Sequence, residues 1–145
     1  MCAIDAGSDS QVADLGKLYR DLGKKVYAIC DKQNDEAKIA IEAQVDRLFM
    51  HDEHDFESLI LKNTPKEALE RFCKTLLWPP HLLKIYPDPA AEAAAALKKY
   101  FDWSKGNWGI ADFLAQCSEA EIPEWIRKTC EELCILCDSS SETGI

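Results

Sequence analysis

The sequence lacks several features that would assign it to common classes of protein. No apolar run in its 145 residues approaches the length of a membrane span. The N-terminus carries no basic segment followed by an apolar one, so we expect no signal peptide. Neither a Walker A motif nor a Gly-x-Gly-x-x-Gly motif is present, and we expect no nucleotide-hydrolysing centre in this chain. No glycines frame Ser8 or Ser10 as they would in a nucleophile elbow.

Basic residues are also scarce. The chain has 17 lysines and arginines against 26 aspartates and glutamates, which gives a formal net charge of -9. Because phosphate binding depends mainly on Lys and Arg, this charge argues against a protein that binds nucleic acid through a broad basic surface. A DNA-binding function would need a metal ion at an acidic site or a basic partner.

Seven cysteines are present, an odd number, and most stand in apolar contexts. This usage predicts reduced, buried thiols in a cytoplasmic protein. Cys130, Cys134 and Cys137 have the spacing that radical-SAM enzymes use for an iron–sulfur cluster. They also place one thiol on each turn of an amphipathic helix near the C-terminus, and we favour a core stripe in which cysteine acts as a small apolar residue.

Strand-like and helix-like patterns alternate over residues 1–62. Apolar runs predict three strands and helical spacing predicts two helices between them, the strands at 1–6, 25–30 and 45–50 and the helices at 11–22 and 34–43. Gly23 stands where a left-handed helix stop belongs. Strand–helix–strand units with short connections are right-handed, so the strands should be parallel. We therefore predict an α/β domain with a short parallel sheet and flanking helices.

Asp31 ends the central apolar run, Val26 to Cys30. An acid at this point is placed at the C-terminal edge of a parallel sheet, where α/β proteins bind ligands. A carboxylate there can hold a hard divalent cation such as Mg²⁺. The alternative is that Asp31 caps the next helix or opens a turn.

A dense group of ligand-type side chains, HDEHDFE, follows the third predicted strand at residues 51–57. His51 and His54 suggest zinc, but no third ligand completes a recognisable spacing. Glu53 and Glu57 lie four residues apart, so on a helix they would face the same way and could bind Mg²⁺ or Mn²⁺. A solvated acidic helix start explains the same residues.

Residues 63–138 have helical patterns throughout and predict an α-helical C-terminal extension, followed by a disordered tail at 139–145. Thr64 and Pro65 predict an N-cap and first helical residue for a helix that runs to about residue 77. Further helices are expected at 89–103, 108–117 and 123–137. Lys105 lies in a turn flanked by Trp103 and Trp108, which is either a stacking surface for bases or a turn held against the core.

Four segments together resemble the rear part of a Toprim domain, and more narrowly the C-terminal region of OLD-family nucleases. These are the ATPase–Toprim proteins that include the nuclease of the Gabija antiphage system. The resemblance extends to about Asp138 and is carried by residues 4–10 (IDAGSDS), 22–33 (LGKKVYAICDKQ), 55–60 (DFESLI) and 104–106 (SKG).

The resemblance implies metal-dependent cleavage of DNA. In that family an early glutamate, an Asp-x-Asp pair, later acids and a lysine hold two Mg²⁺ ions and the scissile phosphate. By position, Asp31 would be the first acid of the pair, Glu53 and Glu57 the later acids, and Lys105 the lysine. Two metal ions can activate the attacking water and neutralise the leaving oxygen, and a lysine can offset charge on the phosphate.

The sequence departs from that pattern in two ways. Gln33 stands where the second acid of the pair belongs, and the early glutamate strand and the ATPase portion are missing. We therefore expect a fragment or split subunit that is inactive alone and that assembles as an oligomer with an upstream ATPase and Toprim portion. The main alternative is a non-catalytic assembly module derived from a Toprim domain. A small metal-binding protein of the receiver type is a third, less favoured interpretation.

Overall fold

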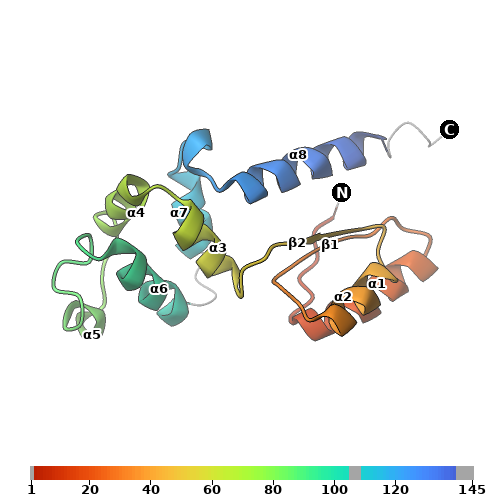
Figure 1. Ribbon diagram of the computed structural model, residues 1–145, viewed down its shortest axis with the longest axis horizontal. Coiled ribbons are helices and arrows are strands. Elements are labelled where there is room, and N and C mark those ends of the chain that lie inside the picture. Colours follow the sequence, from red (N-terminus) through yellow and green to blue (C-terminus); the bar gives the residue numbers. More distant parts are fainter. Residues whose placement is uncertain (1, 105–108, 140–145) are drawn as a thin grey trace. The chain divides into compact units, whose positions relative to one another are not determined.

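The computed structural model describes residues 2–104 and 109–139, and the chain divides into two compact units (Figure 1). The first unit comprises Met1–Asp55 with Glu132–Ile145, and the second comprises Phe56–Glu131. Within the described residues the chain is mostly helical, with one short parallel sheet in the first unit. The predicted combination of an α/β part and a helical C-terminal part is thereby confirmed, whereas the domain border predicted after residue 62 stays a prediction.

The sheet of the first unit has two parallel strands, β1 (Tyr27–Cys30) and β2 (Arg47–Met50). Tyr27 pairs with Arg47 and Cys30 pairs with Met50, so both strands end at the same edge. Helices α1 (Val12–Asp21) and α2 (Asp35–Glu42) pack on one face, where Ala28, Cys30, Ile41 and Val45 form a small buried core. The short 3-10 helix η1 (Asp9–Gln11) leads into α1.

Two residues fix helix ends in this unit: Gly23, as the sequence predicts, and Asn34, whose capping role was not predicted. Gly23 adopts a positive φ of 72° after α1, and Lys24 N–H donates to Tyr19 O while Gly23 N–H donates to Arg20 O. These bonds close the helix with a Schellman motif. Asn34 caps α2, because its side-chain oxygen accepts a hydrogen bond from Ala37 N–H at 2.8 Å.

The predicted strand at residues 1–6 is wrong: residues 2–6 form no strand. The segment offers only one large aliphatic side chain for burial, Ile4, which is exposed. Asp5 Oδ1 also accepts a hydrogen bond from Gly7 N–H at 2.8 Å, and Gly7 has a φ of 76°. A local turn of this kind competes with strand pairing, so the sheet among the described residues has two strands rather than three.

Gly16 lies at the closest approach of α1 to the segment before β2. A Cβ at this position would stand 2.9 Å from Gln44 O and 3.0 Å from Val45 Cγ1. Alanine favours a helix interior over glycine by about 1 kcal/mol, but overpacking against a backbone atom costs about 1–3 kcal/mol. We expect Gly16→Ala to lower the free energy of unfolding by about 1 kcal/mol, measured by urea unfolding followed through the NMR signals of β1. A rise in the free energy of unfolding would contradict this expectation, because it would show that α1 can move away from Gln44 and Val45 without cost.

The second unit is built from α3 (Phe56–Asn63), α4 (Lys66–Cys73), α5 (Pro80–Leu83), α6 (Ala93–Trp103), α7 (Gly109–Ala115), η2 (Glu119–Glu121) and the first half of α8 (Glu124–Ser139). Phe72 is at the centre of its core. The Phe72 ring lies 5.0 Å from the ring of Phe113 and 6.4 Å from that of Phe101, centroid to centroid. Ile60, Leu69, Cys73, Ala93 and Leu97 complete the buried cluster.

Three predicted helix ends in this unit differ from the structure. Helix α4 ends at Cys73 rather than near residue 77, because Thr75 Oγ1 donates to Phe72 O and Trp78 Nε1 donates to Cys73 O. Thr64 does not cap α4, and its buried hydroxyl has no hydrogen-bond partner within the described residues. Helix α6 begins at Ala93 rather than near residue 89, after a turn in which Asp88 O accepts from Ala91 N–H.

Arg71 of α4 and Glu121 of η2 form a bidentate ion pair with N–O distances of 3.0 and 2.8 Å. Glu121 also accepts from Ser118 N–H at 2.8 Å as part of a capping box. The Arg71 guanidinium, followed by the Ser118 amide, lowers the pKa of Glu121 from its ordinary value of 4.5 to about 2.

This ion pair predicts an acid-labile contribution to stability. Because the pKa of Glu121 is depressed in the folded state, the contribution is complete above pH 4.5 and is lost as the pH falls toward about 2. We expect Glu121→Gln to remove that part of the pH dependence of the free energy of unfolding, measured by urea unfolding across this window. An NMR titration of the Glu121 carboxyl carbon with a midpoint near its ordinary value would contradict the account.

Candidate functional site

Asp31 stands immediately after β1, at the C-terminal edge of the parallel sheet, as the sequence predicts. Its side chain is partly exposed. Lys32 N–H donates to Glu53 O at 3.3 Å, which ties the loop after β1 to the loop after β2. The alternative in which Asp31 caps α2 is wrong, because Asn34 occupies that position.

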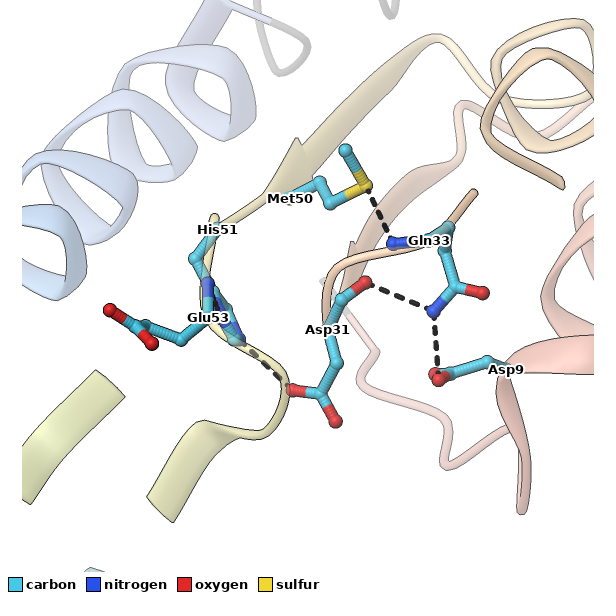
Figure 2. Close-up of polar contacts among 6 residues, drawn as sticks. All are labelled: Asp9, Asp31, Gln33, Met50, His51 and Glu53. Carbon is cyan, nitrogen blue, oxygen red and sulfur yellow. Dashed lines mark hydrogen bonds and ion pairs between the residues drawn. The ribbon is translucent and has the colours of Figure 1, made fainter. Parts of the chain in front are cut away.

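His51 is the closest side-chain partner that the structure shows for Asp31. It follows β2, only 2% of its side chain is exposed, and its Nε2 lies 2.9 Å from Asp31 Oδ1 (Figure 2). Glu53 N–H donates to Nδ1 of the same ring at 3.3 Å. Since Nδ1 accepts, the hydrogen-bond pattern assigns the proton to Nε2, which donates to Asp31. The imidazole thereby fixes the orientation of the carboxylate.

On the sequence alone, His51 suggests only a zinc ligand, an interpretation that is not favoured, so this role is missed. The signal was nevertheless available in the strand register. Cys30 and Met50 are paired, so the next residues along the two strands, Asp31 and His51, are also neighbours. A register argument applied to the two strand ends would have placed the pair side by side.

Gln33 occupies the position expected for a second acid, and its amide connects two loops. Its Nε2 donates to Asp9 Oδ2 at 2.8 Å and to Asp31 O at 3.0 Å, while its backbone N–H donates to Met50 Sδ at 3.4 Å (Figure 2). A carboxylate at this position could not donate the two side-chain bonds and would repel Asp9. Gln33 is therefore a structural link between η1 and the Asp31 loop.

Among the described residues, Glu53 is the other predicted site residue that belongs to the same compact unit as Asp31. Figure 2 shows the carboxylate of Glu53 pointing away from Asp31. Glu57 lies in the first turn of α3, in the second compact unit, and Lys105 lies outside the described residues. Within residues 2–104 and 109–139, no group of three or more His, Cys, Asp or Glu side chains could hold a metal ion.

The edge of the sheet nevertheless has a negative local field. Burial is the main cause that raises the pKa of the Cys30 thiol to about 11, and the carboxylates of Asp9 and Asp31 add to it. Both acids therefore act on the same point at the end of β1. A cation approaching this edge would be attracted by the same two charges.

The cysteines are less uniformly buried than the sequence suggests. Cys30 and Cys73 are buried, and burial raises the pKa of Cys73 to about 12. Cys130 and Cys134 are exposed and Cys137 is half-buried, so the predicted core stripe on α8 is wrong. Helix α8 packs through other positions, including Ile126 and Thr129.

Comparisons of the chain with protein-family models, with curated proteins and with solved structures found no match. Among the helices that the structure describes, none is both long enough and apolar enough to cross a membrane.

Proposed function

We propose that this chain contributes Asp31 as a carboxylate ligand for Mg²⁺ or Mn²⁺ in a DNA endonuclease of the OLD-family Toprim type. The observation that carries the proposal is the geometry of Asp31, a partly exposed carboxylate at the C-terminal edge of a parallel sheet. The buried His51 holds its Oδ1. No hydrogen bond to Oδ2 is found among the described residues, so this oxygen is available to a cation.

A single carboxylate ligand fits Mg²⁺ better than a metal ion that takes all of its ligands from the protein. Mg²⁺ keeps several waters and commonly takes only one or two carboxylates together with substrate phosphates. A bound ion of this kind activates the attacking water and neutralises the leaving oxygen of a phosphodiester. In this proposal Asp31 binds the ion and His51 positions Asp31. By the resemblance, Glu53 and Glu57 would be the later acids and Lys105 would offset charge on the phosphate.

The proposal also includes partners. With a net charge of -9, the chain needs another source of positive charge to hold DNA. An upstream ATPase and Toprim portion, in the same or a neighbouring polypeptide of an oligomer in the cytoplasm, would supply it together with the missing glutamate strand. Antiphage defence is the corresponding role of the resembled nucleases.

Calorimetric titration of the purified chain with Mn²⁺ tests the proposal. We expect the wild type to bind Mn²⁺ and Asp31→Asn to lose binding, because the amide removes the charge but keeps the size and leaves the fold intact. Glu57→Gln tests whether the second unit contributes a ligand. Asp21→Asn is the matched control, since Asp21 is an exposed acid of α1 paired with Lys17. Equal binding by wild type and Asp31→Asn would refute the role of Asp31.

A second candidate function, a non-catalytic assembly module, is favoured by one observation. Ile29 lies in the middle of β1 and is 53% exposed. Within the described residues the sheet has only two strands, so each has an unpaired edge that could accept a further strand. If this function is correct, Ile29→Lys should abolish association measured by light scattering, while Asp31→Asn should leave it unchanged.

A further inference from the structure

Four aromatic rings form a continuous series in the second unit, which does not include Asp31. Trp78 lies 5.2 Å from Tyr100, Tyr100 lies 5.7 Å from Trp103, and Trp103 lies 5.8 Å from His81, measured between ring centroids. The rings belong to α5, to α6 and to the segment before α5. We call these four residues the aromatic series.

One end of the aromatic series is held by a hydrogen bond, whereas the other end is exposed to solvent. Trp78 is fixed by the hydrogen bond from its Nε1 to Cys73 O at 2.9 Å. Trp103, in contrast, is 52% exposed although two other rings contact it, and His81 is also exposed. A large ring that is held by its neighbours and still faces solvent loses little side-chain entropy when a ligand stacks on it.

Two lysines lie one helical turn from the exposed rings. Lys99 precedes Trp103 by four residues on α6, and Lys84 follows His81 by three residues at the end of α5. Residues spaced in this way share a helix face. Both lysines are exposed, and neither has an ion pair among the residues described, whereas Lys98 is paired with Asp102 at 3.4 Å.

The segment that carries the aromatic series, residues 74–103, differs in charge from the chain as a whole. Residues 74–103 contain four lysines and three acids, although the chain as a whole has a net charge of -9. Exposed aromatic rings next to unpaired lysines are the combination with which proteins bind single-stranded nucleic acid: bases stack on the rings and phosphates contact the cations.

We propose that the aromatic series, with Lys84 and Lys99, is a binding surface for single-stranded nucleic acid, where an unpaired base stacks on Trp103. The surface is independent of the metal site proposed at Asp31. A duplex does not fit, because its bases are already stacked on each other and cannot reach the indole. Exposed aliphatic residues nearby, such as Leu83 and Ile85, would also suit a protein partner. The two lysines favour a polyanion instead.

The test is binding of a fluorescein-labelled oligo(dT) of about 15 nucleotides to the full chain, followed by anisotropy at low salt. We expect Trp103→Ala to weaken binding at least about 5-fold, the lower limit for loss of one base–aromatic stack. We expect Trp103→Phe to retain part of the affinity, because a smaller ring still stacks. The double variant Lys84→Gln/Lys99→Gln should reduce the slope of log K against log salt by about 1.4, as for two lost phosphate contacts.

Lys66→Gln is the matched control. Lys66 is in the same unit and is exposed, but it lies beside the first turn of α6, whereas Trp103 is its last residue. Circular dichroism checks that each variant is folded, and the lysine variants test the surface if Trp103→Ala fails to fold. Absence of oligo(dT) binding by the wild type, equal affinity for a duplex, or equal loss in Lys66→Gln would overturn the proposal. Self-association that Trp103→Ala removes, without oligonucleotide binding, would assign the surface to a second copy of the chain instead.

Discussion

Replacing Phe72 by Ala is expected to lower the free energy of unfolding by about 3–5 kcal/mol, the largest loss among the variants considered. Phe72 is 1% exposed and its ring contacts both Phe101 and Phe113. Truncation removes its apolar burial and leaves a cavity that the surrounding helices can close only in part. Urea unfolding followed by tryptophan fluorescence measures the effect, because all four tryptophans of the chain lie within residues 56–131.

Leu77→Ala is the control for this prediction. Leu77 belongs to the same unit but is 94% exposed, so its truncation should change stability by less than about 0.5 kcal/mol. A similar loss in both variants would mean that the measured transition does not report on the core around Phe72. A loss below about 1 kcal/mol for Phe72→Ala would contradict the packing described for this unit.

His51→Leu is expected to weaken Mn²⁺ binding by about 10- to 100-fold without removing any metal ligand. Leucine fills much of the volume of the buried ring but cannot donate to Asp31 Oδ1 or accept from Glu53 N–H. The carboxylate would lose its fixed orientation, and the Glu53 amide would lose its acceptor. Calorimetric titration gives the affinity, and urea unfolding gives the stability.

Two variants make the result specific to the hydrogen bond. His51→Gln retains a side-chain donor and should recover part of the Mn²⁺ affinity. His54→Leu replaces an exposed histidine three residues further on and should bind Mn²⁺ as the wild type does. If His51→Leu and His54→Leu bound Mn²⁺ equally well, His51 would have only a structural role.

The parts of the fold that the sequence predicts correctly depend on strong local signals. The run that ends at Cys30 is apolar and rich in strand-forming residues, and the run that ends at Met50 closes with three apolar residues; both form strands. Gly23 marks a helix end through its backbone chemistry, so its role could be read directly from the sequence. The side chain of Asn34 caps α2 in the same local way, although the sequence analysis placed only the helix start there. Asp31 follows from the same logic, since a parallel strand determines where the next residue lies.

The errors occur where contacts between side chain and backbone override local pattern. The segment around Ile4 forms a turn because Asp5 bonds to Gly7. Helix α4 stops early because Trp78 donates to Cys73 O. Neither hydrogen bond can be predicted from the spacing of apolar residues along the sequence. The direction of Glu53 is likewise set by the loop after β2, whose conformation no repeat pattern specifies.

Mn²⁺-induced broadening of backbone amide signals in the two-dimensional ¹H–¹⁵N NMR spectrum tests the central claim, that Asp31 is a metal ligand, most directly. The account predicts that substoichiometric Mn²⁺ broadens signals of residues 31–33 and 51–53 first, and that Asp31→Asn abolishes this selective effect while Asp21→Asn does not. Broadening centred on other acidic residues, or an unchanged pattern in Asp31→Asn, would contradict the claim.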